Sequence, residues 1–143
     1  MKRFRFRLQR ILDLRVQIRD EARQELVRCT AERDHQIHIL AQLQDEFLQV
    51  GLKEGGTYSA SDIASLGAYS ERLTNSIDQQ KIVVTEAIKA TEAAQERYIE
   101  VSKEAKTLEM LRDKKRQEFD AAQLREEGAL FDELAVQRAT RGY

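Results

Sequence analysis

Apolar residues recur at alternating intervals of four and three along most of this chain, and this spacing constrains the fold more than any other feature. A mean interval of about 3.5 residues is typical of helices wound around one another, because it keeps one apolar seam facing the partner. In the first half of the chain the predicted seam is Ala22, Leu26, Cys29, Arg33, Gln36, Leu40, Leu43, Phe47 and Val50. In the second half it is Ile63, Leu66, Ser70, Leu73, Ile77, Gln80, Val84, Ala87, Thr91, Ala94, Tyr98, Val101, Ala105 and Leu108.

One cluster of helix-breaking residues, between Gly51 and Ser59, separates the two halves of the pattern. Gly51 suits a helix C-terminal cap, because glycine takes up the left-handed conformation at little cost. Ser59 and Asp62 have the spacing of a capping box for a second helix. The chain contains no proline that would break either helix further. The sequence therefore predicts a single domain over 1–143, with a helix over about 4–50, a tip loop over about 51–61 and a helix over about 62–140.

The expected fold is all-α: a long two-helix antiparallel coiled-coil hairpin with unequal helices. If Val50 faces Ile63 across the turn, Leu8 lies near Ala105. The second helix then continues without an intramolecular partner for about 30 residues, or roughly 45 Å. Near the N-terminus the fitting seam is Phe4, Leu8, Ile11, Arg15, Ile18 and Ala22, which places two four-residue steps in succession and predicts a stutter in the supercoil.

Composition argues against several classes of function. The chain has no glycine-rich nucleotide-binding motif, and no cluster of cysteine and histidine that would hold a metal. We therefore expect no cofactor, no metal and no catalytic residues. His35 and His38 share a helix face but lack further ligands, and Cys29 alone cannot form an intramolecular disulfide, which suits the reducing cytoplasm. No apolar run approaches the roughly 20 residues of a membrane span.

Charge is concentrated at the N-terminus, where residues 1–23 carry eight basic and three acidic side chains. Such an end favours an acidic or phosphate-bearing surface. Nucleic acid is not the expected partner, because acidic residues flank the other basic run, Lys114 to Arg116. Adsorption of residues 1–20 to an anionic membrane is a further alternative, since an apolar stripe lies among arginines there: Phe4, Leu8, Ile11, Leu12 and Ile18. The residues themselves point to an interaction protein.

The run from Phe4 to Arg15 reads F-R-F-R-L-Q-R-I-L-D-L-R, and the run from Phe131 to Arg138 reads F-D-E-L-A-V-Q-R. The first resembles the opening F-x-F-x-L-x-x-I-L-x-L-R of the flagellar export protein family FliJ, and the second resembles the D-E-x-x-x-x-R close of that family. The glycine-containing tip and the unequal helices also fit. The stalk proteins of virulence type III secretion share this architecture, so an equivalent stalk of such a system is one alternative. A generic coiled-coil scaffold or adaptor is another.

The resemblance implies a non-enzymatic part of the flagellar type III export apparatus, and hence of motility and chemotaxis. Members of this family resemble the central stalk of rotary ATPases, and their two ends enter the hexameric export ATPase. They promote its activity, couple it to the cytoplasmic domain of the export gate (FlhA-like) and escort export chaperones. The resemblance thus implies a protein that is monomeric alone and cytoplasmic, lying peripherally at the inner membrane through the export apparatus.

Two sets of binding residues follow from the resemblance. Those expected to contact the ATPase are Phe4, Phe6, Arg7, Leu8, Arg10, Phe131, Asp132, Glu133 and Arg138. Those expected to contact the export gate are Gln36, Leu40, Leu43 and Phe47 in the first helix, with Tyr69, Leu73, Ser76 and Gln80 in the second. Three gate positions depart from the family pattern, because Leu43, Ser76 and Gln80 stand where it has an aromatic residue, alanine and histidine.

Overall fold

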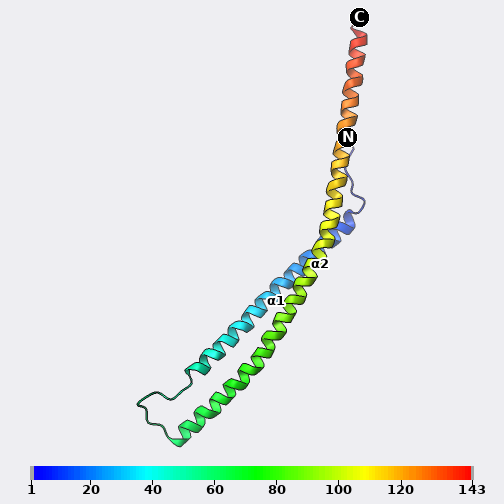
Figure 1. Ribbon diagram of the computed structural model, residues 1–143. Coiled ribbons are helices and arrows are strands. Elements are labelled where there is room, and N and C mark those ends of the chain that lie inside the picture. Colours follow the sequence, from blue (N-terminus) through cyan, green and yellow to red (C-terminus); the bar gives the residue numbers. More distant parts are fainter. Residues whose placement is uncertain (1, 143) are drawn as a thin grey trace. The chain divides into compact units, whose positions relative to one another are not determined.

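The computed structural model describes residues 2–142, which form two long helices packed against each other: α1, Gln9–Gln49, and α2, Ala60–Arg141 (Figure 1). No strand occurs among the described residues. The predicted all-α fold with two unequal, antiparallel helices is confirmed. The chain divides into two compact units, one comprising residues 20–99 and the other comprising residues up to 19 together with residues from 100 onward.

In the unit 20–99, the seam lies where the spacing predicts it. Its most buried members are Ala22, Cys29, Leu73, Ile77, Val84 and Thr91. Cys29 contacts Thr91 and Gln36 contacts Gln80, so residue numbers rise along α1 as they fall along α2, as in an antiparallel pair. Two members of the predicted seam are exposed, Phe47 by 39% and Ile63 by 53%. Ile63 is exposed because α1 ends at Gln49 and leaves no helix opposite it.

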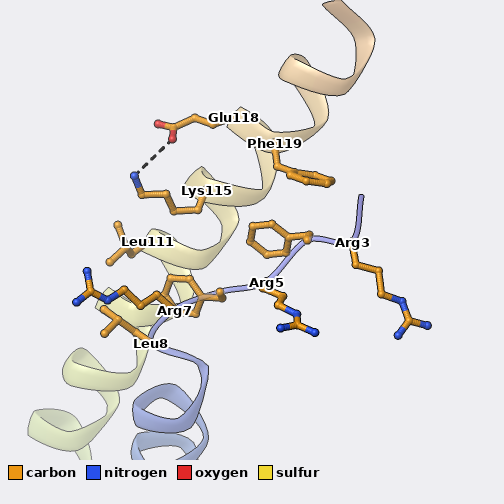
Figure 2. Close-up of a pocket in the computed structure, with 10 residues that line it drawn as sticks. Arg3, Arg5, Arg7, Leu8, Leu111, Lys115, Glu118 and Phe119 are labelled. Atoms are coloured by element: carbon orange, nitrogen blue, oxygen red, sulfur yellow. Dashed lines mark ion pairs between the residues drawn. The ribbon is translucent and has the colours of Figure 1, made fainter. Parts of the chain in front are cut away.

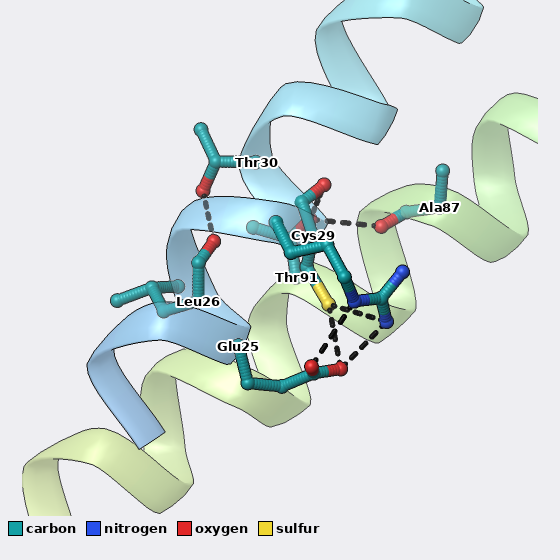
Figure 3. Close-up of polar contacts among 7 residues, drawn as sticks. Glu25, Leu26, Cys29, Thr30, Ala87 and Thr91 are labelled. Carbon is teal, nitrogen blue, oxygen red and sulfur yellow. Dashed lines mark hydrogen bonds and ion pairs between the residues drawn. The ribbon is translucent and has the colours of Figure 1, made fainter. Parts of the chain in front are cut away.

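Two polar layers interrupt this apolar seam, and each is hydrogen-bonded. The Gln80 amide donates to the Gln36 side-chain oxygen at 2.7 Å and to the Gln36 carbonyl at 2.9 Å. The Thr91 hydroxyl lies within hydrogen-bonding distance of the carbonyls of Cys29, at 3.1 Å, and Ala87, at 2.9 Å (Figure 3). Polar groups in a helix seam favour the one register in which they are satisfied, so these layers fix how the helices align.

Cys29 is a buried seam residue, as its position predicts. Burial raises the pKa of its thiol, and the nearby Glu25 carboxylate raises it further. Glu25 itself pairs with Arg28, whose guanidinium holds the pKa of that carboxyl below its ordinary value. The thiol is therefore protonated at neutral pH, and it behaves as a small apolar side chain.

The second helix begins with the predicted capping box. The Ser59 amide donates to the Asp62 carboxylate at 3.0 Å, and the Asp62 amide donates to the Ser59 hydroxyl oxygen at 3.1 Å. These bonds hold the pKa of Asp62 below its usual value. At the other side of the loop, the prediction of a left-handed Gly51 is wrong: Gly55, with φ of 78°, is the left-handed residue in the described chain. The left-handed residue therefore lies inside the loop, and not directly after the last residue of α1.

In the other unit, α1 starts at Gln9 instead of near residue 4, and residues 2–6 are not helical. Leu12 is fully buried, whereas Ile11, which was predicted in the seam, is 46% exposed. From Leu12 the half-buried or buried positions continue to Arg15, Arg19 and Ala22 at steps of three, four and three. Arg15, Ile18 and Ala22 of the predicted seam are half-buried or buried, so the structure corrects the prediction at Ile11, and the stutter stays a prediction.

The predicted pairing of Leu8 with Ala105 is also wrong. Phe4 lies on Phe119 and Lys2 pairs with Glu126, much further along α2. The bonded pairs Gln36–Gln80 and Cys29–Thr91 set a register a few residues further along α2 than the turn geometry predicts, because α1 ends at Gln49 and Val50 does not face Ile63. Before Leu8 the chain is not helical, and an extended chain advances about 3.3 Å per residue against 1.5 Å in a helix, so the N-terminus covers about twice the length of α2. Residues that were expected to lack an intramolecular partner, from 112 to 126, are thereby covered in part.

Candidate functional site

Residues 2–8, which we call the strap, lie along α2 with alternating side chains. Phe4, Phe6 and Leu8 are half-buried, whereas the intervening Arg3, Arg5 and Arg7 are exposed. This alternation has the period of an extended chain, in which neighbouring side chains point to opposite sides. Figure 2 shows the labelled arginines projecting from the strap beside Leu111, Lys115 and Phe119 of α2. The apolar residues thus anchor the strap, and the arginines face solvent.

An aromatic contact secures the middle of the strap. The rings of Phe4 and Phe119 have centroids 5.6 Å apart and planes inclined by 55°, a geometry that suits the ring quadrupoles. The Arg116 guanidinium lies 5.3 Å from the Phe4 ring centroid, within the range of a cation–π contact. An open groove of about 730 Å³, lined by the strap with Leu111, Lys115 and Phe119, runs beside this contact.

Ion pairs join the N-terminal region to α2 on either side of the aromatic contact. Lys2 pairs with Glu126 at 3.3 Å, Arg15 with Glu104 at 2.7 Å and Arg19 with Glu109 at 3.0 Å. The Lys2 pair is well exposed and adds little free energy, whereas the Arg19 pair is the most covered of the three. Together the pairs favour the observed alignment of the strap and the first turns of α1 with α2.

Four arginines in this region have no such partner. Arg3, Arg5, Arg7 and Arg10 form no ion pair with any carboxylate in the part of the chain that the structure describes. The α2 cations beside the strap differ, because each lies close to an acidic neighbour: Arg112 to Asp113, Lys115 to Glu118 and Arg116 to Asp120. The uncompensated positive charge is therefore on the strap and the first turn of α1.

The C-terminal part of α2 is the second feature of the site. Every residue from Leu124 to Gly142 is exposed, and Phe131 is exposed by 68%. Residues 127–142, which we call the tail, carry four large apolar side chains with substantial exposure: Leu130, Phe131, Leu134 and Val136. Phe131, Leu134 and Arg138 line a shallow surface on one side of the tail. A solvated helix seldom carries so much apolar surface unless it binds another molecule.

The residues predicted to bind the ATPase fall into two groups in the structure. Arg7, Arg10, Phe131, Asp132, Glu133 and Arg138 are exposed, whereas Phe4, Phe6 and Leu8 are half-buried by α2. Sequence reasoning missed Leu111, Arg116 and Phe119, the α2 residues that receive the strap. The alternation of arginine with phenylalanine and leucine was the available signal, since period two indicates an extended segment.

The residues predicted to bind the export gate also divide by burial. Leu73 is buried, and Gln36 and Gln80 bond to each other within the seam. Leu40 and Leu43 are half-buried, leaving Phe47, Tyr69 and Ser76 as the exposed members of the predicted patch. The geometry thus gives Leu73, Gln36 and Gln80 a packing role and leaves a smaller outer surface to a partner.

These features define a class of protein: two long helices packed as an antiparallel coiled coil, with an exposed apolar helix end and a basic N-terminus. No helix in the described part of the chain combines the length and apolar character needed to cross a bilayer. A family model described as "Flagellar FliJ protein" matches residues 4–142, and the chain belongs to this FliJ family. Its members are non-catalytic components of flagellar type III protein export. No curated protein and no solved structure matches the chain.

Proposed function

We propose that this protein binds the hexameric export ATPase as a stalk, promotes ATP turnover and couples the ATPase to the export gate, without being an enzyme itself. The observation that carries the proposal is the exposed apolar tail, which has Phe131 and Leu134 on one side and belongs to the same unit as the basic strap. Membership of the flagellar export family supports the same function.

The tail supplies contact area, and the strap supplies charge. Phe131 offers a rigid aromatic side chain of the kind that dominates binding interfaces, and Arg138 lines the same side of the tail. Arg7 and Arg10 would steer the approach of an acidic ring surface, because no carboxylate of the described chain pairs with them. Half-burial of Phe4, Phe6 and Leu8 gives them an indirect role, which is to hold these arginines in place.

The coiled coil itself would supply stiffness and a second binding surface. Its exposed Phe47, Tyr69 and Ser76 are the proposed contacts for the cytoplasmic domain of the export gate. We further propose escort of export chaperones, a monomeric state when the protein is alone, and a peripheral position at the cytoplasmic face of the membrane. Each of these rests on family membership.

ATP turnover by the cognate export ATPase, with and without this protein, tests the proposal. The full chain should raise turnover, and deletion of residues 125–143 should abolish the increase. A tail variant, F131A/L134A, should lose most of the increase, whereas V27A/L48A, which removes exposed apolar side chains elsewhere, should retain it. Equal activation by the full and truncated chains would refute the stalk mechanism and favour a scaffold or adaptor.

A further inference from the structure

The strap and the first turns of α1 carry an unusual charge density. Residues 2–19 contain seven basic residues and one acidic residue, Asp13, giving a net charge of +6. Arg15 and Arg19 are neutralised by glutamates of α2, and Lys2 by Glu126. The positive charge that remains free belongs to four exposed arginines: Arg3, Arg5, Arg7 and Arg10.

One of these arginines, Arg10, is adjacent to exposed aliphatic side chains of α1. Ile11 follows Arg10 directly and is 46% exposed, and Leu14 lies one helical turn after Arg10 and is 54% exposed. Because residues i and i+4 share a helix face, Arg10 and Leu14 are neighbours on the outer surface of α1. The outer surface of this region is thus both basic and apolar, whereas the fully buried Leu12 packs on the inner side.

We propose that this surface, defined by Arg3, Arg5, Arg7, Arg10, Ile11 and Leu14, binds anionic phospholipid membranes. Guanidinium groups pair with lipid phosphates, and exposed aliphatic side chains enter the headgroup region beside them. Arg3, Arg5, Arg7 and Arg10 are all exposed, so their guanidinium groups are available to several headgroups. The protein lies on such a surface and does not span it, in keeping with its helices.

The strap's construction favours a membrane over nucleic acid. Proteins that bind single strands stack bases on exposed aromatic rings. Here Phe4 and Phe6 are half-buried against α2, and Phe4 is already in contact with Phe119 and Arg116. The exposed apolar side chains, Ile11 and Leu14, are aliphatic. Insertion of aliphatic side chains into lipid is favourable, whereas they have no aromatic face on which a base could stack. This binding goes beyond the proposed stalk function and needs no ATPase.

Co-sedimentation of the full chain with vesicles tests the proposal. Vesicles that mix phosphatidylglycerol with phosphatidylcholine should bind the protein, and vesicles of phosphatidylcholine alone should not. A basic residue near an anionic surface strengthens binding by about fivefold, so R5Q/R7Q/R10Q should weaken binding by about a hundredfold. The variant R5K/R7K/R10K should bind nearly as well as the natural chain, because lysine keeps the charge.

A matched control separates this surface from net charge alone. K81Q/K89Q/K106Q removes the same number of charges from exposed lysines of α2 and should change vesicle binding by less than about threefold. I11S/L14S should weaken vesicle binding and leave any binding to a single-stranded DNA oligonucleotide unchanged. Circular dichroism confirms that each variant keeps its helices.

Three results would overturn the proposal. One is equal binding to the neutral and anionic vesicles. Another is an equal loss of binding for the strap variant and the lysine control. The third is displacement from anionic vesicles by a DNA oligonucleotide at equal phosphate concentration, which would indicate a nucleic-acid surface instead. None of these results bears on ATPase activation, which is measured without lipid.

Discussion

The two units cover the same helix, α2, in different ways. In the unit 20–99, a second helix packs on it, and buried side chains of both helices recur at steps of three and four. In the other unit the strap is extended, and its side chains alternate between α2 and solvent. The helical cover buries a continuous seam, which extends into the other unit at Leu12 and Ala105, whereas the strap alternates half-buried apolar residues with exposed arginines. The conformation of the covering segment therefore decides how its charged side chains are arranged over α2.

The two units also differ in their polar contacts with α2, which are neutral hydrogen bonds in one unit and ion pairs in the other. The unit 20–99 satisfies its polar seam atoms with neutral hydrogen bonds, from Gln80 to Gln36 and around Thr91. The other unit uses ion pairs at half-exposed positions, such as Arg19 with Glu109. Neutral layers fix alignment with little dependence on salt, whereas exposed ion pairs are screened. The basic unit should consequently respond to ionic strength more than the coiled coil does.

The largest expected effect is at Leu12, the fully buried side chain beneath the basic surface. Leu12→Ala should lower the free energy of unfolding by about 2–4 kcal/mol, since it removes apolar contacts and leaves a cavity. Urea unfolding followed by circular dichroism measures the change. Leu48→Ala, at a side chain that is 80% exposed, should change it by less than about 0.5 kcal/mol. Similar losses for both would mean that the unit lacks a specific core at Leu12.

A smaller effect is expected in the polar layer of the unit 20–99. Gln80→Leu leaves the Gln36 side-chain oxygen without its donor and should cost about 1–2 kcal/mol. The double variant Q36L/Q80L should recover most of this loss, because two apolar partners fill the layer. Urea unfolding of the single and double variants measures both values. Additive losses in the double variant would contradict a direct interaction between the two side chains.

In the strap, a double-mutant cycle on Phe4 and Phe119 isolates their contact. The coupling free energy should be about 0.5–1.5 kcal/mol, the usual range for an aromatic pair. The three variants are F4A, F119A and the double variant, each unfolded in urea. As a matched control, the coupling between Phe4 and the exposed Phe131 should be near zero. A coupling of zero for Phe4 and Phe119 would mean that the strap is not held on α2.

The smallest effect concerns the cap of α2, which the strap does not touch. The pKa of Asp62 is lowered in the folded state by the Ser59 amide, so its carboxylate stabilises the fold at pH above the ordinary aspartate value. This stabilisation is lost as the pH falls through the lowered pKa of the folded state. The difference in urea midpoint between the natural chain and D62N should therefore shrink on acidification below about pH 4. A difference that stays constant with pH would exclude the capping role.

The two helices, their seam over 20–99 and the capping box could be predicted from the sequence, because each depends on the spacing of residues that are close together in the sequence. It predicted the alignment of the N-terminus with α2 wrongly, because Phe4 and Phe6 fit a helical seam and an extended strap equally well over so short a run. The seam shift from Ile11 to Leu12 followed from that same error. Burial at Leu73 and Gln80 agrees with the predicted seam, whereas the family pattern, which assigns the same positions to a partner, does not distinguish packing from binding.

Cross-linking tests the central claim, that the strap reaches Glu126, most directly. In a C29S background, cysteines at positions 2 and 126 should be joined rapidly by a short bis-maleimide, since the natural side chains pair at 3.3 Å. Cysteines at positions 2 and 110 should not be joined. In a continuous helical pairing with Leu8 near Ala105, residue 2 would lie opposite about residue 111, roughly 22 Å from Glu126. Joining of 2 to 110 but not to 126 would contradict the account.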